Sequence, residues 1–212
     1  MILYGVGASP YVRKTLLVLK EKGLDFEHRM VMPGDKSPEY RAISPFGKIP
    51  ALTDGDFSIC DSTAIITYVE AKFPAKPLLP ADPAERARVI WYEEFGDTIL
   101  AAQVGIIFFN RLVGPRFMGV PGDEAAAQKA VDEGLPPIFA YLESQIPASN
   151  FLVGDRLTLA DVAVTAHLVN LGYVGVEVDA AKYPKLAAYL ATMQARPVFV
   201  EILAAERAMF GG

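Results

Sequence analysis

Gly47-Lys48-Ile49-Pro50-Ala51-Leu52 carries more structural information than any other short stretch of this 212-residue chain. Proline cannot donate a hydrogen bond to a sheet, so Pro50 at the start of a strand-like run predicts a rigid turn of the kind that can contain a cis peptide bond. Such a turn leaves the backbone of Ile49 free to pair with an extended molecule, for example a small peptide. The stretch therefore predicts a peptide-binding turn.

A second turn, Ser9-Pro10-Tyr11, joins a strand pattern to a helix pattern. Ile2-Leu3-Tyr4 before it is typical of a short buried strand, and the apolar residues of 12–22 recur at helical spacing. Ser9 is therefore expected at the N-cap of a helix, with Pro10 at the first helical position. The N-terminus of a helix carries unpaired N–H donors and a partial positive charge, which favour an anion such as a thiolate.

A hydroxyl at this position can change the ionisation of a bound thiol. A free thiol has a pKa of about 8.5 and is roughly 3% ionised at pH 7, and lowering this pKa by about two units takes about 2.7 kcal/mol. One hydrogen bond to a charged group contributes about 1.5–3 kcal/mol, and the helix terminus up to about 1 more. The simpler interpretation is that Ser9 only caps its helix, since Ser-Pro helix starts are common.

A third motif, Asp61-Ser62, precedes a predicted helix from Thr63 to Lys72. With Ser9 and Ile49-Pro50, it makes the chain resemble the cytosolic glutathione S-transferase superfamily, in a serine-type and bacterial-like form, over nearly its whole length. The resemblance implies an α/β N-terminal thioredoxin-like domain that binds glutathione and an all-α C-terminal helical domain. It also implies a cis-proline turn at Ile49-Pro50, an activating hydroxyl at Ser9 and a γ-glutamyl-binding pair at Asp61-Ser62.

The charges of Asp61-Ser62 agree with this role. Glutathione carries an ammonium group, which Asp61 can hold, and an α-carboxylate, to which Ser62 can present its hydroxyl and the helix N–H groups. An ordinary helix cap is the alternative interpretation, and the two roles are compatible. Most members of the superfamily have Glu before this Ser, so the shorter Asp61 departs from the usual pattern.

Two lysines, Lys48 and Lys36, are candidates for binding the glycyl carboxylate of glutathione. By resemblance, the residue before the Ile-Pro pair often faces that end of the peptide, and some serine-type members use a lysine placed like Lys36. Because lysines on loops are usually solvated, Lys48 beside the proline turn is the stronger candidate.

Composition restricts the partners and sites that we expect. A net charge of −5 at pH 7, without a cluster of Lys and Arg, argues against binding to nucleic acid. The single cysteine, Cys60, excludes an internal disulfide framework and a cysteine-rich metal site, and we expect it to be structural. His28 and His167 are far apart in the sequence and have no nearby carboxylate motif, so we expect no metal.

We also expect a cytoplasmic protein without a membrane partner. The chain begins directly with a strand pattern and shows no charged and then apolar leader. No charge-free apolar run of about 18 residues predicts a membrane span.

The pattern along the chain changes near residue 75. Before it, short strands and helices are predicted in the order βαβ, loop, ββα, and after the proline-rich stretch 73–80 the pattern is helical almost throughout. We expect a glutathione-binding domain at 1–75, a linker at 76–84, and a helical domain at 85–212 that contributes the acceptor-substrate pocket.

A strong helix start in the second part is Leu157-Thr158-Leu159-Ala160-Asp161-Val162. Thr158 is expected to cap the helix and Asp161 to reach back to the N–H of the cap. The following residues, 160–171, are apolar on nearly all sides, so we expect them in the centre of the domain. The predicted role of Asp161 is therefore structural.

The residues that contact the acceptor are less well defined. We expect the pocket near Tyr11 and the first long helix, around residues 91–111. The apolar residues Phe95, Ile99, Phe108 and Phe109 suggest a substrate surface, although such residues are more often core or dimer contacts. Arg13 can either add positive potential near the sulfur or form a salt bridge to the second domain.

The resemblance implies a homodimeric transferase active in detoxification, with glutathione as cosubstrate and an electrophilic small molecule as acceptor. Ser9 would hydrogen-bond the sulfur and keep it a thiolate, which attacks the acceptor. Two alternatives stay open. One is a glutathione-dependent disulfide or peroxide reductase, and the other is a noncatalytic regulatory or binding protein of the same fold.

Overall fold

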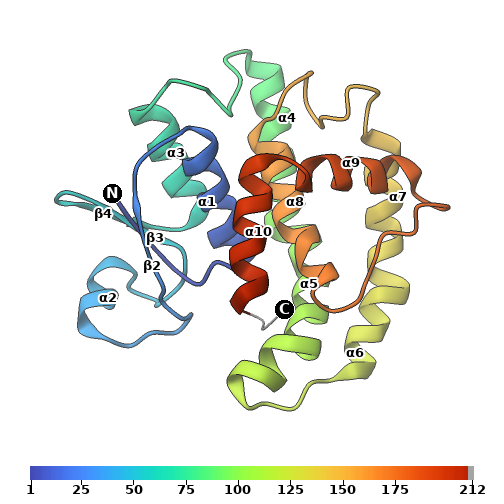
Figure 1. Cartoon of the computed structure of the whole chain (residues 1–212), viewed down its shortest axis with the longest axis horizontal. Coiled ribbons are helices and arrows are strands. Elements are labelled where there is room, and N and C mark those ends of the chain that lie inside the picture. Colours follow the sequence, from blue (N-terminus) through green and yellow to red (C-terminus); the bar gives the residue numbers. More distant parts are fainter. Residues whose placement is uncertain (210–212) are drawn as a thin grey trace. The chain divides into compact units, whose positions relative to one another are not determined.

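The computed structural model describes residues 1–209 and contains two compact units (Figure 1). One unit comprises Met1–Leu79 and the C-terminal segment from Arg196, and the other comprises Pro80–Ala195. The returning segment forms helix α10 (Pro197–Met209), which packs against α1 (Pro10–Glu21). Packing thus places α10 with the first unit, whereas the sequence suggested one helical domain from residue 85 to residue 212. The linker at 76–84 stays a prediction.

The first unit contains a four-stranded sheet in the order β2-β1-β3-β4. β1 (Ile2–Tyr4) runs parallel to β2 (Glu27–Arg29), and α1 connects them. β3 (Ala51–Asp54) lies antiparallel to both β1 and β4 (Phe57–Cys60). Helix α3 (Ser62–Lys72) follows β4, which completes the predicted βαβ, loop, ββα order.

Helix α1 is the central helix of this unit. Every residue from Val12 to Leu19 is buried, because α3 and α10 both pack against α1 (Figure 1). Below the helix, Leu3 and Leu52 face each other across β1 and β3 and are fully buried. A helix covered on so many sides also buries charged residues such as Arg13, which must therefore find a partner inside the unit.

One short helix, α2 (Pro38–Ile43), was not predicted. Its six residues are too few to show a helical repeat, so the sequence reads as a loop there. The helix contacts β3 and β4 and buries Tyr40. It thereby supports the loop that leads to Pro50.

The second unit consists of helices and their connections. Its α-helices are α4 (Pro83–Glu94), α5 (Ala101–Phe108), α6 (Glu124–Lys129), α7 (Leu135–Gln145), α8 (Leu159–Gly172) and α9 (Pro184–Gln194). Three π-helical segments, η1 (Phe95–Leu100), η2 (Phe109–Met118) and η3 (Ala130–Gly134), continue the helices that precede them.

Helix α8 is the core helix of the second unit, as predicted, since every residue from its first to Leu171 is buried. At its start, the Thr158 N–H donates to Oδ2 of Asp161 at 2.9 Å. The other carboxylate oxygen, Oδ1, accepts from the Leu152 N–H at 2.8 Å and from the Tyr189 hydroxyl at 3.3 Å. Asp161 therefore ties the helix start to the preceding loop and to α9.

The helical run Pro83–Met118 is long and apolar enough, by length and composition alone, to cross a membrane. No span was expected from the sequence, because no run of about 18 apolar residues is free of charges. The core helix of a soluble protein can be equally long and apolar, so length and composition alone do not show that this run crosses a membrane. The absence of a membrane partner stays a prediction.

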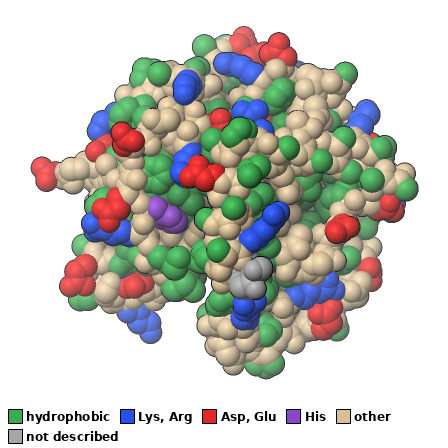
Figure 2. All heavy atoms as spheres, viewed as in Figure 1, with side chains coloured by type: hydrophobic (Ala, Val, Ile, Leu, Met, Phe, Trp, Pro, Cys, Tyr) green, Lys and Arg blue, Asp and Glu red, His purple; other side chains and the backbone are tan. Residues whose placement is uncertain are grey.

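Charged side chains of both signs are interspersed over the face shown in Figure 2. Proteins that bind nucleic acid usually carry a continuous basic patch or stripe.

Candidate functional site

The Ile49-Pro50 turn is the centre of the candidate site, and its peptide bond is cis, as predicted. The backbone N–H of Asp61 donates to the carbonyl oxygen of Pro50 at 3.2 Å. This bond continues the pairing of β3 with β4, in which Ala51 lies opposite Cys60. The sheet therefore brings the proline turn and the Asp61-Ser62 motif to the same place.

The loop that carries Ser9 passes beside this turn. A Cβ on Gly5 would lie 3.2 Å from the Cβ of Ile49 and 2.5 Å from Cγ2 of Val12, and the φ of Gly5 is 142°. Only glycine allows the chain to pass between the turn and α1 in this conformation. The loop that leads to Ser9, the proline turn and the Asp61-Ser62 motif thus all lie at one end of the sheet.

Ser9 takes the predicted N-cap position of α1, and its carbonyl oxygen accepts a hydrogen bond from the Arg13 N–H at 2.8 Å. Its half-buried side chain makes no capping hydrogen bond to the described residues of the helix. Ser9 therefore starts the helix through its backbone. Its hydroxyl lies at a helix terminus, where the N–H groups and the helix dipole favour an anion.

Asp61, rather than Ser62, caps helix α3. Its Oδ1 accepts hydrogen bonds from the N–H groups of Thr63 at 2.9 Å and Ala64 at 3.1 Å. Helix α3 begins at Ser62, one residue earlier than predicted, and Ser62 is only 2% exposed. The φ of Asp61 is 84°, a conformation that Asp and Asn tolerate better than most residues. The exposed carboxylate thus has a structural role, which does not prevent it from also contacting a ligand.

The turn at Lys48 is held by side chains from α2 and the residue that follows it. The carbonyl oxygen of Lys48 accepts from the Tyr40 hydroxyl at 2.7 Å and from the Ser44 hydroxyl at 2.8 Å. Burial raises the pKa of Tyr40 to about 12, so its hydroxyl is a donor at neutral pH. The side chain of Lys48 is exposed and can reach a ligand from this fixed backbone.

The loop that contains Lys36 lies against the same turn. The Gly34 N–H donates to the carbonyl oxygen of Gly47 at 2.8 Å. A Cβ on Gly47, whose φ is 64°, would lie 2.8 Å from the carbonyl oxygen of Asp35. The exposed Lys36 and Lys48 are therefore carried by neighbouring segments, and both stay candidates for a carboxylate.

Arg13 forms a buried salt bridge, as one of the two roles considered for it required, but the salt bridge lies within the first unit. Its Nε donates to both carboxylate oxygens of Glu206, at 2.8 and 3.1 Å. The partner lies on α10 and so belongs to the first unit by packing. No local sequence pattern marks Glu206 as this partner, because the two residues are 193 positions apart.

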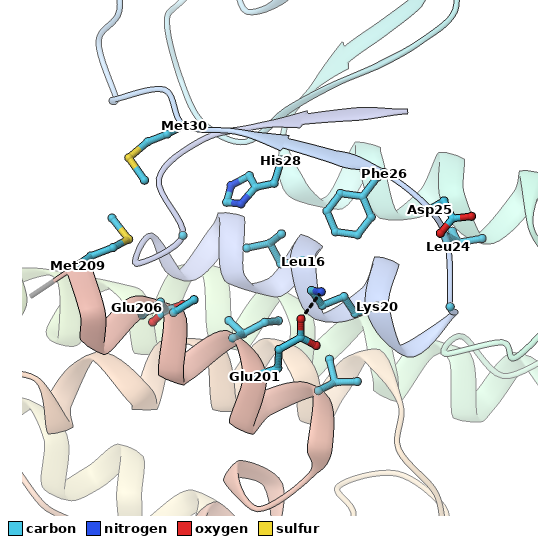
Figure 3. Close-up of a pocket in the computed structure, with 15 residues that line it drawn as sticks. Leu16, Lys20, Leu24, Asp25, Phe26, His28, Met30, Glu201, Glu206 and Met209 are labelled. Atoms are coloured by element: carbon cyan, nitrogen blue, oxygen red, sulfur yellow. Dashed lines mark hydrogen bonds and ion pairs between the residues drawn. The ribbon is translucent and has the colours of Figure 1, made fainter. Parts of the chain in front are cut away.

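A cavity of about 770 Å³ also lies in the first unit, among α1, β2 and α10 (Figure 3). Its lining includes apolar residues such as Leu16 and Phe26, and its polar and charged residues include Lys20, His28 and Glu206. None of the seven candidate glutathione-binding residues lines it. The candidate site is instead formed by the loops at the end of the sheet.

The apolar residues considered for the acceptor fall into two groups in the second unit. Phe95 and Phe108 are buried and belong to the core, whereas Ile99 and Phe109 are 45% and 40% exposed. Ile106, which the sequence analysis did not single out, is also exposed and lies seven residues after Ile99. Only the exposed members can contact a small molecule directly.

The two histidines and the cysteine have different surroundings. His167 is buried, and its Nε2 lies 3.1 Å from Oδ1 of Asp97. The packing of α8 against η1 creates this pair from residues 70 positions apart. His28 is exposed and contacts the carbonyl oxygen of Gly5 at 2.8 Å. Cys60 is partly exposed at the end of β4.

The sequence models of two protein families match the chain. The family described as "Glutathione S-transferase, N-terminal domain" matches residues 3–77, and the family described as "Glutathione S-transferase, C-terminal domain" matches residues 117–206. The chain is also 33% identical over 213 residues to glutathione S-transferase 3 of Zea mays, across 96% of this chain and 93% of that relative. The chain belongs to the glutathione S-transferase family. Its fold is therefore the predicted one, a thioredoxin-like α/β domain followed by a helical domain.

Other members of the family show how its functions vary. A solved structure of glutathione S-transferase-I bound with lactoylglutathione has a TM-score of 0.83 and 27% identity, and the match covers 96% of this chain and 98% of that chain. FtsZ-localized protein A of Caulobacter vibrioides (strain NA1000 / CB15N) is 29% identical over 200 residues, which is 92% of this chain and 87% of that relative. Its name refers to a location rather than to a reaction.

Proposed function

We propose that this member of the glutathione S-transferase family is a glutathione transferase, which binds glutathione as cosubstrate and joins its sulfur to an electrophilic small molecule. The observation that carries the proposal is the meeting of three motifs at one end of the sheet. Gly5 packs against Ile49 beside the Ser9 loop, and the Asp61 N–H bonds to the carbonyl oxygen of Pro50. The match to a relative that holds lactoylglutathione supports a glutathione-like ligand.

The positions of these groups suit the parts of glutathione. The cysteinyl backbone pairs with the backbone at Ile49, next to the cis proline. Asp61 holds the ammonium group of the γ-glutamyl end, while the N-terminus of α3 at Ser62 faces its carboxylate. Lys48 and, as a weaker contact, Lys36 attract the glycyl carboxylate.

Ser9 acts on the sulfur. Its hydroxyl donates a hydrogen bond to the sulfur, and the N-terminus of α1 adds positive potential, so that the thiol releases its proton to solvent. The thiolate then attacks the electrophilic carbon, a C–S bond forms, and the leaving group departs with its electron pair. Ser9 stabilises the anion and is not itself the nucleophile.

The acceptor is proposed to be apolar. Ile99, Ile106 and Phe109 belong to one continuous helical run, and each is at least 40% exposed. An aromatic or aliphatic electrophile would cover part of this surface. Substituting Ile106 by Ser should then raise KM for an apolar acceptor while leaving the dissociation constant of glutathione unchanged.

Two measurements test the proposal directly. Isothermal titration calorimetry should detect glutathione binding to the folded protein, and an aryl halide should be converted to its glutathione conjugate. Absence of binding by well-folded protein would refute the proposal. Binding without turnover of a panel of electrophiles would favour a noncatalytic role, in line with the relative named for its FtsZ localisation.

The reductase alternative has its own signature. In that case the bound thiolate attacks a disulfide sulfur or a peroxide oxygen instead of carbon, and the S–S or O–O bond breaks with release of a thiol or an alcohol. A second glutathione then attacks the glutathione sulfur of the product, which forms glutathione disulfide and releases the second thiol or water. Turnover of a mixed disulfide or a peroxide at a higher kcat/KM than the aryl halide would support it.

We further propose a homodimer in the cytoplasm. Phe46, between Pro45 and Gly47, is 80% exposed, and burying such an aromatic side chain against a second copy would be favourable. Substituting Phe46 by Ser should then shift the molecular mass in light scattering toward that of a monomer. Cell fractionation would test the cytoplasmic location.

A further inference from the structure

We propose that Glu206, on the C-terminal helix α10, is a positioning residue for the reaction at Ser9, because it fixes Arg13 against the loop that carries Ser9. This inference rests on the proposed function of Ser9. Glu206 lies far from the three motifs in the sequence, and it acts through another side chain rather than on glutathione.

The contact between Arg13 and Glu206 is specific and shielded from water. Arg13 is fully buried and Glu206 is 2% exposed. Nε of Arg13 donates to both oxygens of the carboxylate, and Nη2 donates to Oε2 as well. A planar guanidinium that meets a carboxylate through two nitrogens is held in orientation as well as in distance.

Arg13 in turn contacts the loop at two consecutive residues. Its Nη2 donates to the carbonyl oxygen of Ala8 at 3.4 Å, and its backbone N–H donates to that of Ser9 at 2.8 Å. Arg13 thus holds both peptide units next to the Ser9 Cα, one through its side chain and the other through its backbone. A change in the guanidinium position would therefore be transmitted to the Ser9 hydroxyl.

Two other ion pairs join α1 to the C-terminal segment that contains α10, and they can be compared with the Arg13–Glu206 pair. Lys20 pairs with Glu201 at 2.8 Å, and Glu21 pairs with Arg196 at 3.3 Å. Figure 3 shows the Lys20–Glu201 pair and, farther along α10, Glu206. The Lys20–Glu201 side chains are 31% and 65% exposed, and such surface pairs contribute little to stability. This pair is therefore a matched control.

Stability alone does not account for a buried pair at this place. Removing two charges from water is costly, and apolar residues of similar volume often stabilise a protein equally well. What the apolar residues cannot provide is a hydrogen bond to the Ala8 carbonyl with a defined direction. The geometry therefore points to a role in fixing the Ser9 loop.

The test compares two double variants that each remove one ion pair with no change in net charge. Arg13→Met with Glu206→Met removes the buried pair, and Lys20→Met with Glu201→Met removes the exposed one. The pKa of the bound thiol is measured from thiolate absorbance against pH, and kcat and KM are measured with an aryl halide. Circular dichroism and thermal melting establish that each variant is folded.

In the first variant we expect the pKa of the bound thiol to rise by about one unit, which means about tenfold less thiolate below that pKa. At such a pH kcat should fall about tenfold, while KM for glutathione changes little, because the contacts at Ile49 and Asp61 are intact. The control variant should match the unmodified protein.

A folded first variant with the same thiol pKa and kcat as the control would overturn the inference. If that variant does not fold, Arg13→Lys replaces it, since lysine keeps the charge but lacks the planar two-nitrogen contact. The same rise of the thiol pKa in Arg13→Lys would support the inference. An unchanged thiol pKa in that variant would overturn it. An unshifted pKa in Ser9→Ala would instead remove Ser9 from the mechanism, and this inference with it, whereas the absence of glutathione binding would refute the proposed function as a whole.

Discussion

The backbone N–H of Asp61 donates a hydrogen bond to the carbonyl oxygen of Pro50 at 3.2 Å. This bond uses only backbone groups, so it joins the proline turn to the start of α3 whatever side chain stands at residue 61. The carboxylate of Asp61 separately caps α3 through Thr63 and Ala64. The structural and ligand-binding roles of Asp61 can therefore be separated by substitution.

Substitution of Ser9 by Ala should leave most of the glutathione affinity intact but raise the pKa of the bound thiol. The lost hydrogen bond to a charged group corresponds to about 1.5–3 kcal/mol, or about one to two pKa units. Ultraviolet absorbance of the thiolate against pH measures the shift. Ser58→Ala, at an exposed position in β4, is the control. An unchanged pKa would remove Ser9 from the mechanism.

Asp61→Asn should weaken glutathione binding without destabilising the protein. Asn keeps an oxygen for the cap and tolerates the positive φ, but it lacks the charge that attracts an ammonium group. The lost interaction corresponds to about 1.5–3 kcal/mol in the binding free energy measured by calorimetry.

Asp61→Ala separates the two roles further. This variant also loses the cap and places Ala at a φ of 84°, so unfolding by urea should show about 1–3 kcal/mol lower stability. Equal affinity for glutathione in Asp61→Asn and the unmodified protein would assign Asp61 to the cap alone.

Asp161→Ala should lower the free energy of unfolding by more than the loss of an ordinary cap, which costs about 0.5–2 kcal/mol. Besides the cap bond from the Thr158 N–H, the carboxylate accepts from the buried N–H of Leu152, and leaving that donor unsatisfied costs about 1–3 kcal/mol more. We therefore expect a loss of about 2–5 kcal/mol in denaturant unfolding. Unchanged stability with lost activity would contradict this structural role.

The stability of the protein should also depend on pH through Asp161. Burial raises the pKa of Asp161 to about 6, although the hydrogen bonds from Leu152 and Thr158 act in the opposite direction. Between the pKa of about 4 in the unfolded chain and 6 in the folded one, the folded state binds more protons, so this residue makes stability fall as pH rises. The stability that protonation of Asp161 contributes is fully present below pH 4 and is lost above pH 6.

Asp161→Asn isolates this contribution, because the amide does not titrate. The difference in unfolding free energy between the unmodified protein and Asp161→Asn should decrease by on the order of 1–3 kcal/mol from pH 4 to pH 7. Urea unfolding of both proteins at several pH values measures it. A difference that stays constant would show that Asp161 has an ordinary pKa in the folded state.

Much of the first unit could be predicted because its signals are local. Pro50 before a strand, Ser9-Pro10 before a helix and the alternation of short apolar runs were sufficient for the order of strands and helices. The helix α2 was missed because six residues carry too little periodicity. The cap of α3 was placed one residue late, because either Asp61 or Ser62 can serve as a cap and only their backbone angles distinguish them.

The surroundings of single side chains were much less predictable. Phe95 and Phe109 are equally apolar in sequence, yet Phe95 is buried and Phe109 is exposed, because the packing of other elements against the helical run decides which of its residues are covered. The Asp97–His167 contact depends on how α8 packs against η1. No local pattern marks such a pair.

The amino-acid sequence was enough to establish the family fold and the order of the three glutathione motifs, since these follow from backbone limits at proline, helix capping and hydrophobic periodicity over a few residues. Folding in three dimensions decided that α10 joins the first unit and that Glu206 neutralises Arg13 next to the Ser9 loop. A buried charge takes whatever partner the packing of distant helices brings within hydrogen-bond distance, and that partner cannot be read from neighbouring residues.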